Sequence, residues 1–414
     1  LISRQRFFGV PFPVWYPLDA DGEPLYDQMI VADEASLPVD PVTACPPGYK
    51  ESQRGIPGGF IADPDVMDTW ATSSLTPQIA SGWERDEELF NLTFPMDIAP
   101  QGHDIIRTWL FSRIVRANFE NHSLPWRRTT ISGFVTDPDR KKMSKSKGNV
   151  VVPSDILERF GSDAVRWRAA MARPGMDSPF DQSQMKVGRR LAMKILNAGK
   201  FVLGLAPEPG DPAAVTNPVD RALLASLSDV VTACTETFDA FDYTQALEAA
   251  ETFFWSFCDD YLELVKERAY GSQGPEAQAS AQSALAIALD VQLRLFAPFL
   301  PFVTEETWSW THGSSIHRSP WPTAGELAID GDRQLLANVA SVLIMIRGAK
   351  SNAKVSMKTP VRKAVFLGDH AALERLKAIE ADLRAVGHIT GEVVWKIAEG
   401  PLTVEAELEE PPAA

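Results

Sequence analysis

A short basic segment holds the residues of this chain that are best suited to chemistry. It runs from Arg140 to Asn149 and reads Arg-Lys-Lys-Met-Ser-Lys-Ser-Lys-Gly-Asn. Five of its first eight residues are basic, in a chain of formal net charge −15. Two lysines three positions apart, Lys142 and Lys145, can follow the pyrophosphate that leaves a triphosphate and stabilise its developing charge. The alternative interpretation is a solvated basic turn.

The composition is that of an ordinary globular protein. With 414 residues, 45% hydrophobic and 23% charged, the chain can form two or three domains with their own cores. No run approaches the roughly 18 apolar residues of a membrane span, and there is no signal peptide. The negative net charge argues against nonspecific binding of nucleic acids, although local basic patches can still bind a nucleic acid.

The three cysteines, Cys45, Cys234 and Cys258, form no Cys-x-x-Cys pair and therefore no zinc signature. Scattered thiols of odd number are typical of the cytosol, so we expect a cytoplasmic protein. The first residues, Leu1–Gln5, contain no methionine and read as interior sequence. We expect the chain to be the C-terminal part of a longer protein.

Two kinds of architecture follow one another along the chain. Residues 1–152 alternate short apolar runs, such as Phe12–Tyr16 and Thr129–Val135, with an amphipathic stretch at 104–118, which predicts an α/β domain. After Pro153 the apolar spacing becomes helical. We predict helices over 183–203, from Pro218 with Asn217 as N-cap, over 244–270 and over 275–296. Together these form a helical bundle.

The buried stripes of these helices follow from the same spacing. We predict that the inward residues are Val187, Leu191, Ile195, Ala198, Val202, Val219, Leu223, Leu227, Val231, Cys234, Phe253, Phe257, Tyr261 and Leu264. From about residue 333 the sequence predicts one more helix. Three strands, at 364–367, 392–396 and 402–406, complete a small α+β appendage.

The basic segment resembles the signature loop of class I aminoacyl-tRNA synthetases, and four other segments of the chain resemble class Ia. These are Ile2–Pro11, the active-site segments Asp68–Ser74 and Gly102–Ile106, and the anticodon-domain segments Trp255–Glu263 and Phe299–Glu306. Gly-His-Asp-Ile at residue 102 is similar to the valyl enzymes rather than to the Gly-Ser-Asp-Gln of isoleucyl enzymes. An isoleucyl-type enzyme stays the alternative within the class.

The resemblance implies four parts: a catalytic half at 1–152 of Rossmann type, connecting helices at 153–212, an anticodon-binding bundle at 213–325 and an α+β appendage at 326–414. It implies that Lys142 and Lys145 are catalytic, with Asp104 accepting hydrogen bonds from the ATP ribose. The alternative role of Asp104 is a helix N-cap. The implied ATP contacts are Lys142, Met143, Ser144, Lys145, Ser146, Gly102 and Asp104.

The resemblance also implies a valine pocket walled by Trp70 and Ile105, although either residue could be core. An apolar pocket of this kind cannot strongly reject threonine, so editing is needed. His103 is expected beside the site rather than as a base. The helix at 183–203 is expected to contact tRNA phosphates, unless its cations are merely solvated. Its cations are Lys186, Arg189, Arg190 and Lys194.

One signature of the class does not occur in this sequence. None of the six histidines stands in a His-x-Gly-His. We therefore expect the N-terminal half of the synthetic site and the editing domain to be missing, and the chain alone to be inactive. The whole enzyme is expected to be a monomer that joins valine to tRNA(Val) with ATP and Mg²⁺, without protein-bound zinc. The alternatives are a non-catalytic tRNA-binding module and one subunit of a split enzyme.

Overall fold

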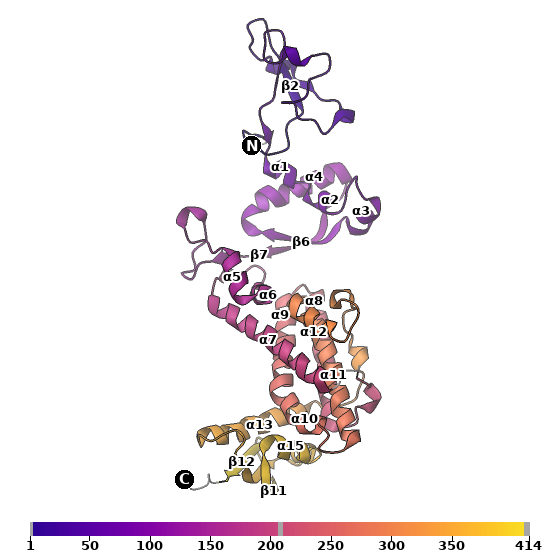
Figure 1. Cartoon of the computed structure of the whole chain (residues 1–414), viewed down its shortest axis with the longest axis vertical. Helices are drawn as coiled ribbons and strands as arrows, with labels where there is room; N and C mark the ends of the chain where they lie inside the picture. The colour runs from indigo at the N-terminus through magenta and orange to yellow at the C-terminus, as the bar shows by residue number, and fades with distance from the viewer. Residues whose placement is uncertain (1–2, 206–209, 410–414) are drawn as a thin grey trace. The chain divides into compact units, whose positions relative to one another are not determined.

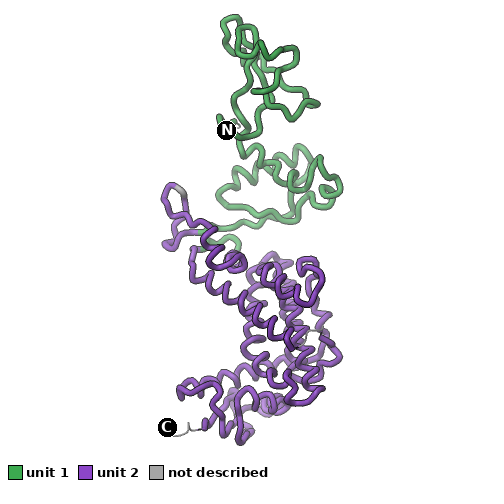
Figure 2. Tube along the Cα trace, viewed as in Figure 1, with its two compact units in different colours: residues 1–135, 174–178 green, residues 136–173, 179–414 purple. Residues whose placement is uncertain are grey.

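The computed structural model describes residues 3–205 and 210–409, apart from the side chain of Lys145, and divides into two compact units. Unit 1 comprises residues 1–135 and 174–178, and unit 2 comprises residues 136–173 and 179–414 (Figure 2). The short strands β8 (Val135–Thr136) and β9 (Ser178–Pro179) stand where the chain passes between the units. Each unit is described by itself.

Unit 1 begins with a loop-rich lobe. Strand β2 (Val14–Pro17) pairs antiparallel with β3 (Ile30–Val31) and β4 (Phe60–Ala62), while β1 (Ser3–Arg4) pairs with β5 (Val66–Met67). The lobe is small, so hydrogen bonds supplement its core: the Trp15 indole donates to the carbonyls of Pro41 and Ala44 at 3.0 and 3.1 Å. The apolar run Phe12–Tyr16 that the sequence shows overlaps β2.

The rest of unit 1 is built around two parallel strands, β6 (Met96–Gly102) and β7 (Trp126–Ser132), in register from Met96 opposite Trp126 to Gly102 opposite Ser132. The crossover between them begins with a 3-10 turn (His103–Ile105) and a π-helical turn (Ile106–Leu110) before α4 (Phe111–Asn121). The predicted amphipathic helix is thus α-helical only from Phe111. Three short helices precede β6: α1 (Thr69–Ser73), α2 (Thr76–Ala80) and α3 (Glu87–Thr93).

Unit 2 is mainly a helical bundle, in which α8, α9, α11 and α12 pack beside one another (Figure 1). Its helices are α5 (Pro153–Phe160), α6 (Ser162–Ala170), α7 (Gln182–Leu205), α8 (Pro218–Asp239), α9 (Tyr243–Ser256), α10 (Leu262–Ala269), α11 (Pro275–Phe296), α12 (Pro301–Ser309) and α13 (Gln334–Asn352). The Asn217 side chain accepts the N–H of Val219, so the predicted N-cap is confirmed. The predicted stripe of α8 is fully buried.

One predicted helix is interrupted. The chain at 244–270 forms α9, then a π-helical turn (Phe257–Tyr261), then α10. On α9, Phe254 is buried at 1% exposure while the predicted Phe253 is only partly buried, as is Val187 on α7. The predicted Phe257, Tyr261 and Leu264 are buried, so the core-facing stripe continues through the π turn.

The C-terminal part of unit 2 is the small α+β element that the sequence predicts. Strand β10 (Val361–Gly368) lies between β11 (Ile389–Ile397), which is parallel to it, and β12 (Thr403–Leu408), which is antiparallel. Two helices of eight residues, α14 (His370–Lys377) and α15 (Glu380–Gly387), cover it and were not predicted. One continuous apolar core extends from Trp167 in α6 to Ile389 in β11.

Candidate functional site

Hydrogen bonds of two side chains, Asp137 and Asn149, hold together the lysine loop of unit 2, residues 140–149. The sequence alone did not predict a role for either side chain. Asp137 is buried, and its two carboxylate oxygens accept the N–H of Lys141 at 2.7 Å and the amide of Asn149 at 2.8 Å. The Asn149 Oδ1 in turn accepts the N–H of Ser144 at 2.9 Å. These bonds, led by the one from Asn149, hold the pKa of Asp137 below its usual value.

The loop presents its polar groups to solvent. Lys142 and Ser146 are exposed, Met143 and Ser144 are half-buried, and the hydroxyls of Ser144 and Ser146 lie 3.2 Å apart. The backbone forms a 3-10 turn at Lys145–Lys147 and then reverses at Gly148, whose φ of +66° favours glycine. The side chain of Lys145, the predicted phosphate ligand, lies outside the described part of the structure.

In unit 1, the predicted nucleotide contacts lie at the carboxyl end of β6. Gly102 is the last residue of that strand, and Asp104 lies inside the following 3-10 turn rather than at its N-cap, which is Gly102 itself. A Cβ atom at position 102 would stand 3.2 Å from the Asp104 carboxylate and would crowd it. The carboxyl ends of parallel strands are where open α/β sheets bind ligands.

The ring of His103 contacts residues at the end of β7. Its Nδ1 lies 3.0 Å from the carbonyl oxygen of Ser132, and its ring meets the edge of Phe134 at 4.2 Å between centroids. This contact joins the turn after β6 to the end of β7. The imidazole therefore fixes the shape of the strand ends that carry Gly102 and Asp104.

The two predicted pocket walls, Trp70 and Ile105, also lie in unit 1. Trp70 is the second residue of α1, is 39% exposed, and donates its backbone N–H to the N-cap carboxylate of Asp68 at 2.9 Å. That carboxylate is buried and pairs with Arg4, which keeps the pKa of Asp68 low. Ile105 is half-buried at the end of the 3-10 turn. Unit 1 thus holds four of the candidate residues, and unit 2 holds the lysine loop.

The basic residues predicted on α7 differ in their surroundings. Lys186, Arg189 and Arg190 are exposed, and the Arg189 guanidinium donates to the carbonyl of Arg159. Lys194 is half-buried and forms an ion pair with Asp259 at 2.9 Å. The Arg190 guanidinium lies over the Trp255 ring at 4.9 Å. An anion would therefore compete with Asp259 for Lys194, whereas Lys186 and Arg189 are more accessible to it.

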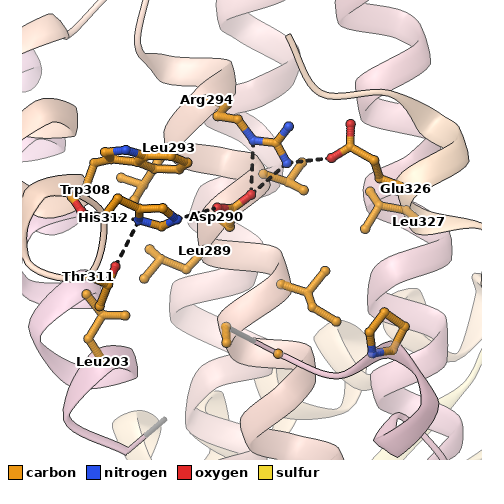
Figure 3. Close-up of a pocket in the computed structure, with 15 residues that line it drawn as sticks. Leu203, Leu289, Asp290, Leu293, Arg294, Trp308, Thr311, His312, Glu326 and Leu327 are labelled. Carbon is orange, nitrogen blue, oxygen red and sulfur yellow. Dashed lines mark hydrogen bonds and ion pairs between the residues drawn. The ribbon is translucent and has the colours of Figure 1, made fainter. Parts of the chain in front are cut away.

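A partly open hollow of about 330 Å³ lies within the bundle, and none of the predicted site residues lines it (Figure 3). Arg294 links Asp290 and Glu326 at 2.7 and 2.6 Å, and the ring of His312 stacks on Trp308 at 3.6 Å. The polar groups form ion pairs with one another, and the other lining residues are mostly apolar. The arrangement is therefore typical of bundle packing.

The described residues contain neither a candidate metal-binding cluster nor a candidate membrane-spanning helix. Among residues 3–205 and 210–409, no group of three or more His, Cys, Asp or Glu side chains could hold a metal ion. No helix in the same ranges is long and apolar enough to cross a membrane.

Comparison with known proteins agrees with the two kinds of architecture. A family model described as "tRNA synthetases class I (I, L, M and V)" matches residues 1–181, and one described as "Anticodon-binding domain of tRNA ligase" matches residues 220–365. The valine–tRNA ligase of Cutibacterium acnes is 63% identical over 415 residues, which cover 100% of this chain and 48% of that protein. The chain belongs to the class I tRNA synthetases. Its similarity to the valyl enzymes is also confirmed.

Other relatives of this synthetase chain support the same assignment. The valine–tRNA ligase of Thermobifida fusca is 57% identical, over 99% of this chain and 46% of that protein. The chain thus spans about half the length of the curated relatives it matches. The solved Agrobacterium radiobacter K84 LeuRS, from a ternary LeuRS-tRNA-LeuAMS complex, has a TM-score of 0.59 at 23% identity and covers 80% of this chain and 44% of that one. The predicted α/β part followed by a helical anticodon-binding bundle is therefore confirmed.

Proposed function

We propose that this chain is the part of a valine–tRNA ligase that carries the lysine loop, one wall of the nucleotide site and the tRNA-binding bundle. The enzyme would attach valine to tRNA(Val) through valyl-adenylate, with ATP and Mg²⁺ as the substrate complex. The observation that carries the proposal is the 63% identity to a valine–tRNA ligase along the whole chain. We also propose that the enzyme is a cytoplasmic monomer.

In the first step, an oxygen of the valine carboxylate attacks the α-phosphorus of ATP and pyrophosphate leaves. No base is needed, because the carboxylate is already ionised. Negative charge grows on the leaving pyrophosphate, and Lys142 and Lys145 would stabilise it at their ammonium groups. The Asp137–Asn149 contact would hold the loop in the shape that presents both lysines. The terminal ribose hydroxyl of tRNA then attacks the acyl carbon, and AMP leaves.

The other proposed contacts are those at the end of β6. Asp104 would accept hydrogen bonds from the ribose hydroxyls, and Gly102 would leave room for that carboxylate. Trp70 and Ile105 would enclose the isopropyl group of valine. Lys186, Arg189, Arg190 and Lys194 would contact tRNA phosphates, with Lys194 released from Asp259. The four-part division at residues 152, 212 and 325 belongs to the same proposal.

The parallel strands β6 and β7 support the view that further strands complete this site. Parallel sheets are almost always covered on both faces and contain more than two strands. Here Ile98 on β6 and Ile131 on β7 are 39% and 40% exposed. Additional strands and helices are therefore expected to cover them in the working enzyme.

A chimera tests the proposal directly. The 414 residues would replace the matching segment of the Cutibacterium acnes enzyme, and valine-dependent exchange of pyrophosphate into ATP would be measured. In this background Lys145→Ala should lower the exchange rate by about 10²- to 10³-fold, because it removes a charge-assisted contact made mainly in the transition state. Lys200→Ala, which removes an exposed lysine from α7, is the control. A loss below about threefold at Lys145 would contradict the assignment.

The chain by itself offers a second test. We expect it to bind tRNA in a filter assay, with an affinity that falls steeply with salt, and to give no exchange above background. Lys186→Gln and Arg189→Gln should each reduce the salt slope by about one if they contact phosphates. Exchange by the isolated chain would show that it holds a complete synthetic site and would refute the proposed division of labour.

A further inference from the structure

An arginine in unit 1 is buried without an acidic partner. Arg113 on α4 is 3% exposed, and no carboxylate pairs with it in the described part of the chain. Its guanidinium lies between two indole rings, 3.6 Å from the centroid of Trp109 and 4.3 Å from that of Trp126. Burial lowers the pKa of this guanidinium. A buried charge costs free energy unless it is compensated, so the two rings and its hydrogen bonds must hold it.

One hydrogen bond leads from Arg113 to the end of β6. Its Nη2 donates to Oε1 of Gln101, which is 2% exposed, and the Nε2 of Gln101 donates to the carbonyl of Gly102 at 2.8 Å. A guanidinium can only donate, so it fixes which end of the Gln101 amide is the acceptor. The amide N–H therefore faces Gly102, two residues before Asp104.

A second path leads from the same cluster to α1. The Trp109 indole, which packs on Arg113, donates its N–H to the carbonyl of Ser73 at 3.0 Å. Ser73 is the last residue of α1, the helix that contains Trp70. Arg113 also donates from Nε to the backbone carbonyl of Trp109 at 3.4 Å.

We propose that Arg113 is a positioning residue that sets two separate parts of the synthetic site. Through Gln101 it orients Gly102–Asp104, and through Trp109 it holds α1 with Trp70. The naming of these parts as nucleotide and valine contacts rests on the proposed function. The positioning itself rests on the hydrogen bonds and ring contacts alone.

Three substitutions separate the two paths. Gln101→Glu keeps an acceptor for Arg113, now charged, but cannot donate to the Gly102 carbonyl. Trp109→Phe keeps a ring for the guanidinium but loses the donor to Ser73. Arg113→Lys keeps the charge and loses the planar group that both rings contact. Arg116→Met is the control, because Arg116 lies on the same helix in an ion pair with Glu120 that is 43% exposed on each side.

Hydrogen exchange of the full 414-residue chain tests the positioning without any substrate. Gln101→Glu should speed exchange at residues 101–105 by about fivefold, as loss of one ordinary hydrogen bond does, and leave 69–74 unchanged. Trp109→Phe should speed exchange at residues 69–74 and leave 101–105 unchanged. Arg113→Lys should speed exchange in both segments. Arg116→Met should affect neither. If Gln101→Glu and Trp109→Phe leave their own segments unchanged, the proposal is overturned, even where Arg113→Lys fails to fold.

Kinetics in the chimera test the functional consequence. Gln101→Glu should raise the KM for ATP at least about fivefold with the KM for valine within twofold, and Trp109→Phe should show the opposite split. Arg113→Lys should raise both and lower kcat. If the exchange pattern appears without this KM split, Arg113 is a positioning residue as proposed, and the error lies in the substrate contacts assigned to Gly102, Asp104 and Trp70.

Discussion

The shape of the lysine loop depends on the side-chain amide of Asn149. It accepts the N–H of Ser144 at 2.9 Å and donates to the buried carboxylate of Asp137 at 2.8 Å. Replacing Asn149 with alanine removes both bonds. A bond to a carboxylate contributes about 1.5–3 kcal/mol and a neutral bond about 0.5–1.5 kcal/mol, so the ordered loop loses about 2–4.5 kcal/mol. A longer contact with the Lys142 carbonyl, at 3.4 Å, adds little.

This loss should appear in catalysis rather than in overall stability. If the ordered loop is the form that binds the leaving pyrophosphate, about 2–4.5 kcal/mol corresponds to a fall of about 30- to 2,000-fold in the rate of pyrophosphate exchange. The lower part of this range is expected, because Asn149 is only half-buried and water replaces part of each bond. The assay is valine-dependent exchange by the chimera described above, with the melting temperature measured beside it.

The control and the pH dependence sharpen the test. Asn118→Ala removes an exposed amide from α4 and should leave exchange within twofold. The pKa of Asp137 is lowered in the folded chain, so the stability that its ionised form contributes is present above its unfolded pKa and is lost as pH falls through the folded one. The effect of Asn149→Ala should therefore not vary between about pH 6 and 8. Exchange within threefold of the parent, in a folded variant, would refute the reasoning.

Three other predictions follow from single contacts. Trp70→Ala should raise the KM for valine far more than the KM for ATP, and an unchanged valine KM would exclude Trp70 from the proposed valine pocket. Arg268→Met should lower the free energy of unfolding by about 3–5 kcal/mol in urea titrations, because it strands the buried carboxylates of Asp220 and Asp382, which lie 2.7 and 3.0 Å from the guanidinium. Partial desolvation lowers the pKa of His388, so stability should be greatest above its unfolded pKa and fall as pH drops through the folded pKa. His388→Asn, which tolerates the φ of +51°, should flatten that dependence.

Much of the bundle could be predicted because its signals are local. Asn217 and Pro218 mark the start of α8, and α11 ends at Phe296, two residues before Pro298, so cap chemistry set these bounds within a residue or two. The π turn at Phe257–Tyr261 has no such signal, since its residues also suit an α-helix. Helices α14 and α15 have eight residues each and are too short to be stable alone, so packing on the sheet decides them.

The candidate site also contains residues that the sequence predicts and residues that it does not. The lysine loop and the Gly102–Ile106 segment are contiguous motifs, and the sequence alone points to them. Asp137 closes the lysine loop by accepting from a residue twelve positions away. An aspartate before a proline otherwise indicates an ordinary turn. The role of Arg113 is harder to predict, because its partners lie on three elements. They are Gln101 on β6, Trp126 on β7 and Trp109 in the π-helical turn before α4. A cation in an amphipathic helix normally predicts a solvated face.

Arg113 and Asp137 also show why motif residues are insufficient to define the site. Lys142, Asp104 and Trp70 are exposed. Buried and half-buried groups behind them supply the order: the Asp137 carboxylate and the Asn149 amide for the lysine loop, and the Arg113 guanidinium in contact with two indole rings for the end of β6 and for α1. Charge burial is costly, so these groups persist only where several partners hold them at once. The same partners restrict the motion of the exposed residues, and catalysis by positioned charges requires that restriction.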